Sequence, residues 1–251
     1  MKPWPYPGLV AHRGGGSLAP ENTLASIRVG QSLGFHMHEF DVKLSRDEIP
    51  FLLHDATLER TTTGTGPSCE RTWKELSQFD AGRWHSESFR GERLASFEAA
   101  ARLLQEKDTL ANVEIKPSPG FEVRTGEKAA EAAAELWHDA SVPPLLSSFS
   151  FEALMAAKRA APKLPRGFLT RDIVSEDWKR LDELEAVSVH TDWRTFQMEN
   201  LARAHAKGLR VLLYTVNDPE KARSYFDAGV DSLVTDNLAE FARLFPEAIR
   251  A

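Results

Sequence analysis

The amino-acid sequence predicts an α/β fold, specifically a closed (β/α)8 TIM barrel. Short apolar runs alternate along the chain with amphipathic segments, which is typical of a parallel sheet covered by helices. Eight such apolar runs can be counted, and the chain has 251 residues. Because barrels of this type commonly occupy about 250 residues as one unit, we expect a single barrel domain over residues 1–251. An open, doubly wound sheet is the alternative.

The predicted strands mostly lack polar alternation, as expected for strands covered on both faces. In chain order they are Leu9–His12, Met37–Val42, Asn112–Lys116, Leu145–Phe149, Gly167–Thr170, Ala186–His190, Arg210–Val216 and Ser232–Asp236.

Helices are predicted where apolar residues recur at helical spacing, as in Phe97–Leu104, Ala129–Leu136 and Met198–Ala202. Asp218 and Pro219 form a helix start, since an N-cap acceptor precedes a proline in the first turn, and Gly229 suits the helix end.

One interval interrupts this alternation. From approximately 43 to 94 the chain is largely polar and carries Trp73 and Trp84. A structureless loop of this length would be unusual in a compact domain. We therefore expect a small insertion after the second strand, packed over the barrel mouth.

Composition excludes several functional classes. The formal net charge is -6, so neither nucleic-acid binding nor stable membrane association is expected. The only cysteine, Cys69, suits a reducing compartment. Three prolines within Met1–Pro7 oppose a signal peptide. We expect a cytoplasmic protein acting on small molecules; the sequence predicts no oligomeric state.

Acidic residues occur at the ends of two neighbouring predicted strands. Glu39 and Asp41 are two apart, so both point to one face of their strand. Glu114 could supply a third oxygen ligand from the next strand, and together they would suit a hard divalent cation. A structural ion cluster with Arg13 and Lys116 is equally compatible with the residues alone.

Histidines provide the acid–base candidates, because imidazole titrates near neutral pH. His12 ends the first strand, and His54 follows an apolar segment and precedes an aspartate. His36 and His38 could suggest zinc, but alternation places them on the face opposite the acids. We therefore exclude them from the ligand set.

Two further patterns are ambiguous. Gly14–Gly16 could let backbone approach a phosphate or could form a plain flexible turn. Glu59 and Arg60, taken alone, indicate surface charge.

Beyond these patterns, the chain resembles the glycerophosphodiester phosphodiesterase family. The opening Trp4–Pro7 and the stretch Pro143–Phe149 look like the cytoplasmic bacterial members linked to glycerol-3-phosphate uptake. The matching blocks follow the family's order: Ala11–Gly14, Ala19–Thr23, Glu39–Val42, Leu53–Asp55, Leu58–Thr61, Val113–Lys116, Leu146–Phe149, Tyr214–Asn217, Gly229–Asp231 and Thr235–Asp236.

The resemblance implies a barrel that hydrolyses glycerophosphodiesters, such as glycerophosphocholine and glycerophosphoethanolamine, to sn-glycerol 3-phosphate and an alcohol. It implies one divalent cation, Mg²⁺ first, with Mn²⁺, Co²⁺ or Ca²⁺ as alternatives. It implies that His12 and His54 are the acid–base pair and that Glu39, Asp41 and Glu114 are the metal ligands. The implied substrate or phosphate contacts are Arg13, Lys116, Glu21, Phe149, Tyr214 and Asn217. Tyr214 stands where the family often has tryptophan.

The sequence leaves two other functions open. A related phospholipase-type phosphodiesterase would act on intact lipid, but the chain shows no amphipathic interfacial helix. A non-catalytic barrel could bind glycerophosphate as a sensor, although none of the implied catalytic residues is missing. Because the implied contacts reach mostly the glycerophosphate half, we expect several alcohols to be tolerated.

Overall fold

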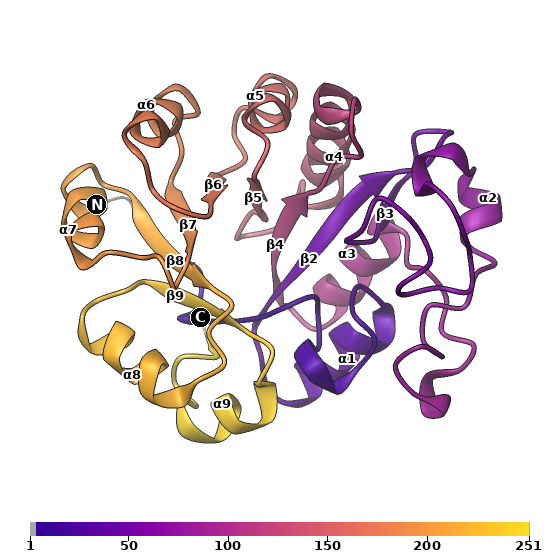
Figure 1. Cartoon of the computed structure of the whole chain (residues 1–251), viewed down its shortest axis with the longest axis horizontal. Helices are drawn as coiled ribbons and strands as arrows, with labels where there is room; N and C mark the ends of the chain where they lie inside the picture. Colours follow the sequence, from indigo (N-terminus) through magenta and orange to yellow (C-terminus); the bar gives the residue numbers. More distant parts are fainter. Residues whose placement is uncertain (1–3, 251) are drawn as a thin grey trace.

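A computed structural model describes residues 4–250, and within them a closed parallel barrel confirms the predicted fold class. The strands run in the order β1-β9-β8-β7-β6-β5-β4-β2, and β1 also pairs with β2 to close the ring (Figure 1). The barrel strands are β1 Leu9–Ala11, β2 Met37–Leu44, β4 Leu110–Ile115, β5 Leu145–Ser148, β6 Arg166–Thr170, β7 Ser188–Asp192, β8 Arg210–Tyr214 and β9 Ser232–Thr235.

Helices surround the strands in Figure 1 and cover their outer face. The predicted start at Asp218 is confirmed, because its side chain accepts hydrogen bonds from the backbone N–H groups of Glu220 and Lys221. The α-helices outside the insertion are α1 Leu24–Ser32, α3 Phe97–Glu106, α4 Glu122–Leu136, α5 Phe151–Ala160, α6 Ser175–Glu183, α7 Met198–Ala206, α8 Pro219–Asp227 and α9 Leu238–Leu244.

The barrel interior is apolar near the amino ends of the strands. A buried cluster there comprises Tyr6, Val10, Met37, Leu145, Leu212 and Val234. Side chains alternate along a strand, so the next inward positions fall two residues later, at or near the carboxyl ends. Those positions carry His12, Glu39, Ser147, Tyr214 and Asp236. The same alternation that builds the core therefore delivers polar groups to the barrel mouth.

An insertion follows β2, as predicted, and lies beside the barrel in Figure 1. It begins with β3, Pro50–Leu52, which pairs antiparallel with β2, and continues through η2 Ser68–Glu70, α2 Trp73–Leu76 and η3 Glu87–Phe89. Its buried core comprises Phe51, Leu53, Leu58, Leu76, Ala81 and Leu94. The insertion is thus packed around its own apolar cluster rather than being a loose loop.

The predicted orientation of His38 is confirmed. Its buried Nδ1 donates to the Gly14 carbonyl at 3.0 Å, and the ring packs against Gly30 of α1, on the outer face of β2. The residues Met1–Pro3, on which the signal-peptide prediction partly rests, lie outside the described residues. Within residues 4–250, no helix has the length and apolar character needed to cross a membrane.

Candidate active site

Three carboxylates meet at the carboxyl ends of β2 and β4. The parallel register places Asp41 beside Glu114, and Glu39 lies one inward position earlier on β2. One oxygen from each of the three side chains lies within 4.8 Å of the others, and all three residues are buried. The structure therefore brings together the predicted ligand set, which could hold a metal ion.

Negative charge in this cluster is only partly balanced by the neighbouring cations. Burial and the charge of Asp41 raise the pKa of Glu39 to about 8, and the same causes raise the pKa of Glu114. Burial also acts to raise the pKa of Asp41, but the charges of Lys116 and Arg13 outweigh it and lower that pKa to about 2. A divalent cation would favour the ionised form of all three acids, so the donor set fits a hard cation.

Two cations border the triad. Lys116 Nζ lies 2.5 Å from Glu114 Oε1 and 3.6 Å from Asp41 Oδ1. Arg13 Nε lies 3.7 Å from Asp41 Oδ2, and Arg13 Nη1 lies 2.7 Å from Glu21 Oε1. The side chains of Arg13 and Lys116 remain 21% and 23% exposed, so both cations can reach a bound anion.

The loop after β1 adopts a strained conformation at Arg13. Its φ of 47° lies in the left-handed region, which costs a non-glycine residue about 1 kcal/mol or more. In return, the Arg13 N–H donates to Glu39 Oε2 at 3.0 Å. Gly14 and Gly16 also have positive φ, and a Cβ at Gly16 would clash with the Asp236 carbonyl. The three glycines thus allow a close-packed turn, not a flexible one.

Asn22 ties this loop to the triad. Its amide donates to Asp41 Oδ2 at 2.8 Å, and its side-chain oxygen accepts from the Asp41 N–H at 3.0 Å. Asn22 also has a positive φ of 58°, which asparagine tolerates better than most residues. The pair of hydrogen bonds fixes the orientation of the Asp41 carboxylate.

His12 is oriented by Asp236 at the end of β9. His12 Nδ1 lies 2.6 Å from Asp236 Oδ1, which leaves Nε2 directed toward the triad, 3.9 Å from Glu39 Oε2. Asn217 Nδ2 donates to the other oxygen of Asp236 at 3.1 Å. Both carboxylate oxygens of Asp236 are therefore engaged in holding His12 and Asn217.

His54 has an equivalent carboxylate partner, which is supported in turn by an arginine. His54 Nδ1 lies 2.7 Å from Asp55 Oδ1. Arg60 binds Asp55 through Nε and Nη2 at 2.6 and 3.0 Å, and it binds Glu21 through Nη1 and Nη2 at 2.7 and 2.8 Å. Because Glu21 also binds Arg13, a continuous chain of charged contacts links the insertion to the loop after β1.

The two histidines differ in their electrostatic setting. Burial lowers the pKa of His12, but the hydrogen bond to Asp236 and the charge of Glu39 outweigh burial and raise the pKa overall. For His54, burial lowers the pKa, and the opposing charge of Asp41 does not compensate. Two imidazoles with Nδ1 held by a carboxylate can transfer protons through Nε2.

An aromatic wall borders the triad on the side of β5 and β8. The rings of Phe149 and Tyr214 meet edge to face at a centroid distance of 5.8 Å, and Lys116 Nζ lies 5.2 Å from the centroid of Phe149. The Tyr214 hydroxyl donates to the Thr170 carbonyl at 2.9 Å. These two residues, with Glu39 and Glu114, line a narrow cavity of about 40 Å³.

Comparison with known proteins fits this geometry. The sequence profile of the glycerophosphoryl diester phosphodiesterase family matches residues 12–240. The chain belongs to that family. A glycerophosphodiester phosphodiesterase from Caldanaerobacter subterraneus subsp. tengcongensis is 33% identical over 233 residues, which covers 91% of this chain and 93% of the relative. Another from Bacillus subtilis is 26% identical and covers 90% of this chain and 82% of the relative.

A solved structure is also similar. It is that of an Oleispira antarctica phosphodiesterase in complex with the product sn-glycerol-3-phosphate, with 32% identity and a TM-score of 0.89 over 96% of this chain and 97% of the other. Because the chain belongs to this family, it is an enzyme that hydrolyses glycerophosphodiesters.

Four residues that contribute to the site of this phosphodiesterase were not among the predicted site residues: Asn22, Asp55, Arg60 and Asp236. Asn22, Asp55 and Asp236 all lie inside the matching sequence blocks, which was the signal that could have identified them. Arg60 was interpreted as surface charge. The Arg60 side chain is indeed 44% exposed, but it also bridges Asp55 and Glu21.

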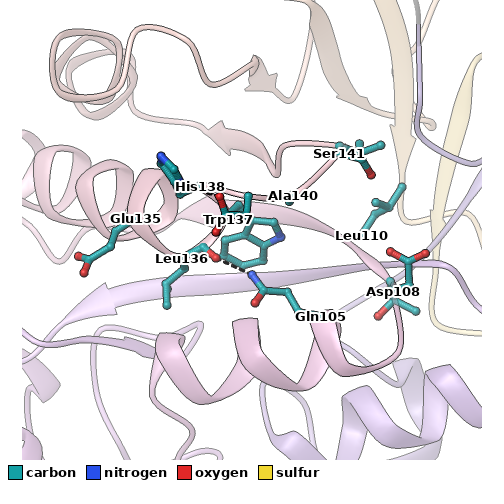
Figure 2. Close-up of a pocket in the computed structure, with 12 residues that line it drawn as sticks. Gln105, Asp108, Leu110, Glu135, Leu136, Trp137, His138, Ala140 and Ser141 are labelled. Carbon is teal, nitrogen blue, oxygen red and sulfur yellow. Dashed lines mark hydrogen bonds and ion pairs between the residues drawn. The ribbon is translucent and has the colours of Figure 1, made fainter.

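A cavity at the opposite end of the barrel has no part in this site. It lies between the turn after α3 and the turn after α4 (Figure 2). Its lining includes Gln105, whose side chain donates to the Leu136 carbonyl at 2.6 Å, and Trp137. Barrel enzymes act at the carboxyl ends of their strands, and this cavity contains none of the predicted catalytic residues.

Proposed function

We propose that this enzyme hydrolyses glycerophosphodiesters such as glycerophosphocholine and glycerophosphoethanolamine to sn-glycerol 3-phosphate and an alcohol, using one divalent cation and two histidines. The observation that carries the proposal is the arrangement of His12 and His54 at the same barrel mouth as the acidic triad, each with Nδ1 held by an aspartate. The product complex of the Oleispira antarctica relative supports the substrate class.

Glu39, Asp41 and Glu114 would hold the cation. Their all-oxygen donors suit Mg²⁺ first, with Mn²⁺, Co²⁺ or Ca²⁺ as alternatives. The raised pKa values of Glu39 and Glu114 support this assignment, since buried acids in one cluster need further positive charge to ionise together. When bound, such a cation supplies Lewis-acid polarisation of a phosphoryl oxygen.

Arg13 and Lys116 would neutralise the remaining phosphoryl oxygens. The guanidinium of Arg13 offers parallel donors that match phosphate geometry, and its backbone is fixed by the contact with Glu39. Glu21 binds both Arg13 and Arg60, so we assign it the task of orienting Arg13 beneath the phosphate.

His12 and His54 would carry the protons. One imidazole removes the proton from the attacking hydroxyl as the hydroxyl oxygen bonds to phosphorus. The other imidazole protonates the departing alkoxide as the bond between phosphorus and the alcohol oxygen breaks. The resemblance suggests that the attacker is the neighbouring glycerol hydroxyl, which gives a cyclic phosphate that water then opens. Each proton transfer is worth on the order of 10²–10⁴-fold in rate.

Three further residues would shape the pocket. Phe149 and Tyr214 provide an apolar wall for the glycerol carbons beside the triad. Asn217 would act through Asp236, because its amide donates to that carboxylate and its side-chain oxygen accepts from the Asp236 N–H at 2.8 Å. Its contacts thus support a positioning role.

Release of glycerol 3-phosphate from glycerophosphocholine tests this function. ³¹P NMR identifies the product, and a coupled dehydrogenase assay gives the rate for the native chain and for His12→Ala and His54→Ala. We expect glycerol 3-phosphate from the native chain and a loss of at least about 100-fold in each variant. Choline phosphate as the product, or a variant near the native rate, would contradict the proposal.

A further inference from the structure

A second cavity meets the active site at His12. It measures about 460 Å³ and is lined by the loop after β1, by Asp236 and by the insertion residues Trp84 and His85. The cavity beside the triad measures about 40 Å³ and also reaches His12. A phosphodiester carries a group on each side of phosphorus, and the larger cavity beside His12 has room for one of them.

The wall formed by Trp84 and His85 is held in place although Trp84 is exposed. The indole N–H of Trp84 donates to the Ala81 carbonyl at 2.8 Å. His85 Nε2 binds the Ser17 carbonyl at 3.1 Å, which joins this wall to the loop after β1. Trp84 nevertheless retains 41% exposure. A large aromatic ring that is fixed and exposed beside a cavity is suited to contact a ligand.

The charged groups of this cavity already have partners. Glu21 binds Arg13 and Arg60, and Asp236 binds His12. The aromatic side chain of Trp84 is therefore the lining group left to discriminate between ligands here. The face of an indole ring attracts ammonium groups, whether primary or quaternary, through its quadrupole.

Building on the proposed function, we propose that this cavity binds the alcohol half of the substrate and that Trp84 favours alcohols carrying a positive amine. Choline and ethanolamine are of this class, whereas glycerol is not. Diesters of neutral alcohols would still be cleaved, since binding in this cavity does not require a charged group on the alcohol. Trp84 would therefore raise kcat/KM for diesters of positively charged alcohols without excluding the others.

Variants at Trp84 test this assignment with two substrates, glycerophosphocholine and glycerophosphoglycerol. Trp84→Leu removes the aromatic face, whereas Trp84→Phe retains one and serves as the matched control. The readout is the ratio of kcat/KM for the choline diester to that for the glycerol diester. The thermal midpoint of each variant checks that the insertion remains folded.

We expect Trp84→Leu to lower this ratio about tenfold, mainly through KM for the choline diester, in line with a partly desolvated cation–π contact. Trp84→Phe should stay within about threefold of the native ratio. An unchanged ratio in Trp84→Leu, whether both rates fall together or neither falls, overturns the assignment. A native chain that releases glycerol 3-phosphate from neither diester instead refutes the proposed function itself.

Discussion

Replacing Asp236 by asparagine isolates the orientation of His12. The carboxylate accepts from His12 Nδ1 at 2.6 Å through one oxygen and from Asn217 Nδ2 at 3.1 Å through the other. An amide has a single acceptor oxygen, so it can serve only one of these donors. Asn217 cannot rotate to compensate, because its own oxygen accepts from the Asp236 N–H and from Thr235 Oγ1 at 2.8 and 3.2 Å.

The size of the effect follows from the lost contact. A hydrogen bond to a charged group contributes about 1.5–3 kcal/mol, and about 1.4 kcal/mol corresponds to a tenfold change in rate. Asp236→Asn should therefore lower kcat for glycerophosphocholine by between about tenfold and 150-fold. KM should change little, since neither His12 nor Asp236 is assigned to ground-state binding of the phosphate.

Asp231→Asn is the matched control. Asp231 binds His205 Nε2 at 2.8 Å and Arg210 Nη1 at 2.8 Å, near the start of β9 and so at the other end of the barrel. The same chemical change there should lower the free energy of unfolding but leave kcat near the native value. A kcat for Asp236→Asn within about threefold of native would refute the proposed orientation of His12.

Two further perturbations address the insertion and the barrel interior. Arg60→Gln should lower kcat/KM about tenfold, because Asp55 and Glu21 both lose a partner. The control Arg90→Gln breaks only the exposed pair with Glu87 and should have no effect in the same assay. Equal kcat/KM values for the two variants would contradict the proposed role of Arg60 in linking the insertion to the loop after β1. Burial lowers the pKa of His190 to about 3, so between that value and about 6.5 the unfolded chain binds a proton that the folded chain does not. The free energy of unfolding should therefore fall as pH drops below about 6.5. In urea titrations, His190→Asn should make the dependence of this free energy on pH shallower by about 1.4 kcal/mol per pH unit. An unchanged pH dependence in the variant would contradict the assignment of this effect to His190.

Strand alternation explains why much of the site could be predicted from sequence. Glu39 and Asp41 necessarily share a face, and Glu114 follows on the next strand of the barrel, so a local pattern placed all three. His38 was excluded by the same rule. The eight predicted barrel strands were found because buried parallel strands are continuous apolar runs.

Contacts between distant residues could not be predicted in this way. Asp236 and His12 are 224 residues apart, and only closure of the barrel between β1 and β9 brings them together. The bridging contacts of Arg60 were missed because Glu21, one of its two partners, lies 39 residues away in another loop. β3 was missed because it is three residues long and lies in a polar interval.

Dependence on a divalent cation tests the central claim most directly. The rate of glycerol 3-phosphate release from glycerophosphocholine is measured as Mg²⁺ is titrated into chelator-treated native protein. Because Lewis-acid stabilisation is worth several kcal/mol, we expect a rate at least about 100-fold below the maximum at the start and a saturable rise to full activity. Full activity in excess chelator, with no response to added Mg²⁺ or Mn²⁺, would contradict the assignment of Glu39, Asp41 and Glu114 as the ligands of a catalytic ion.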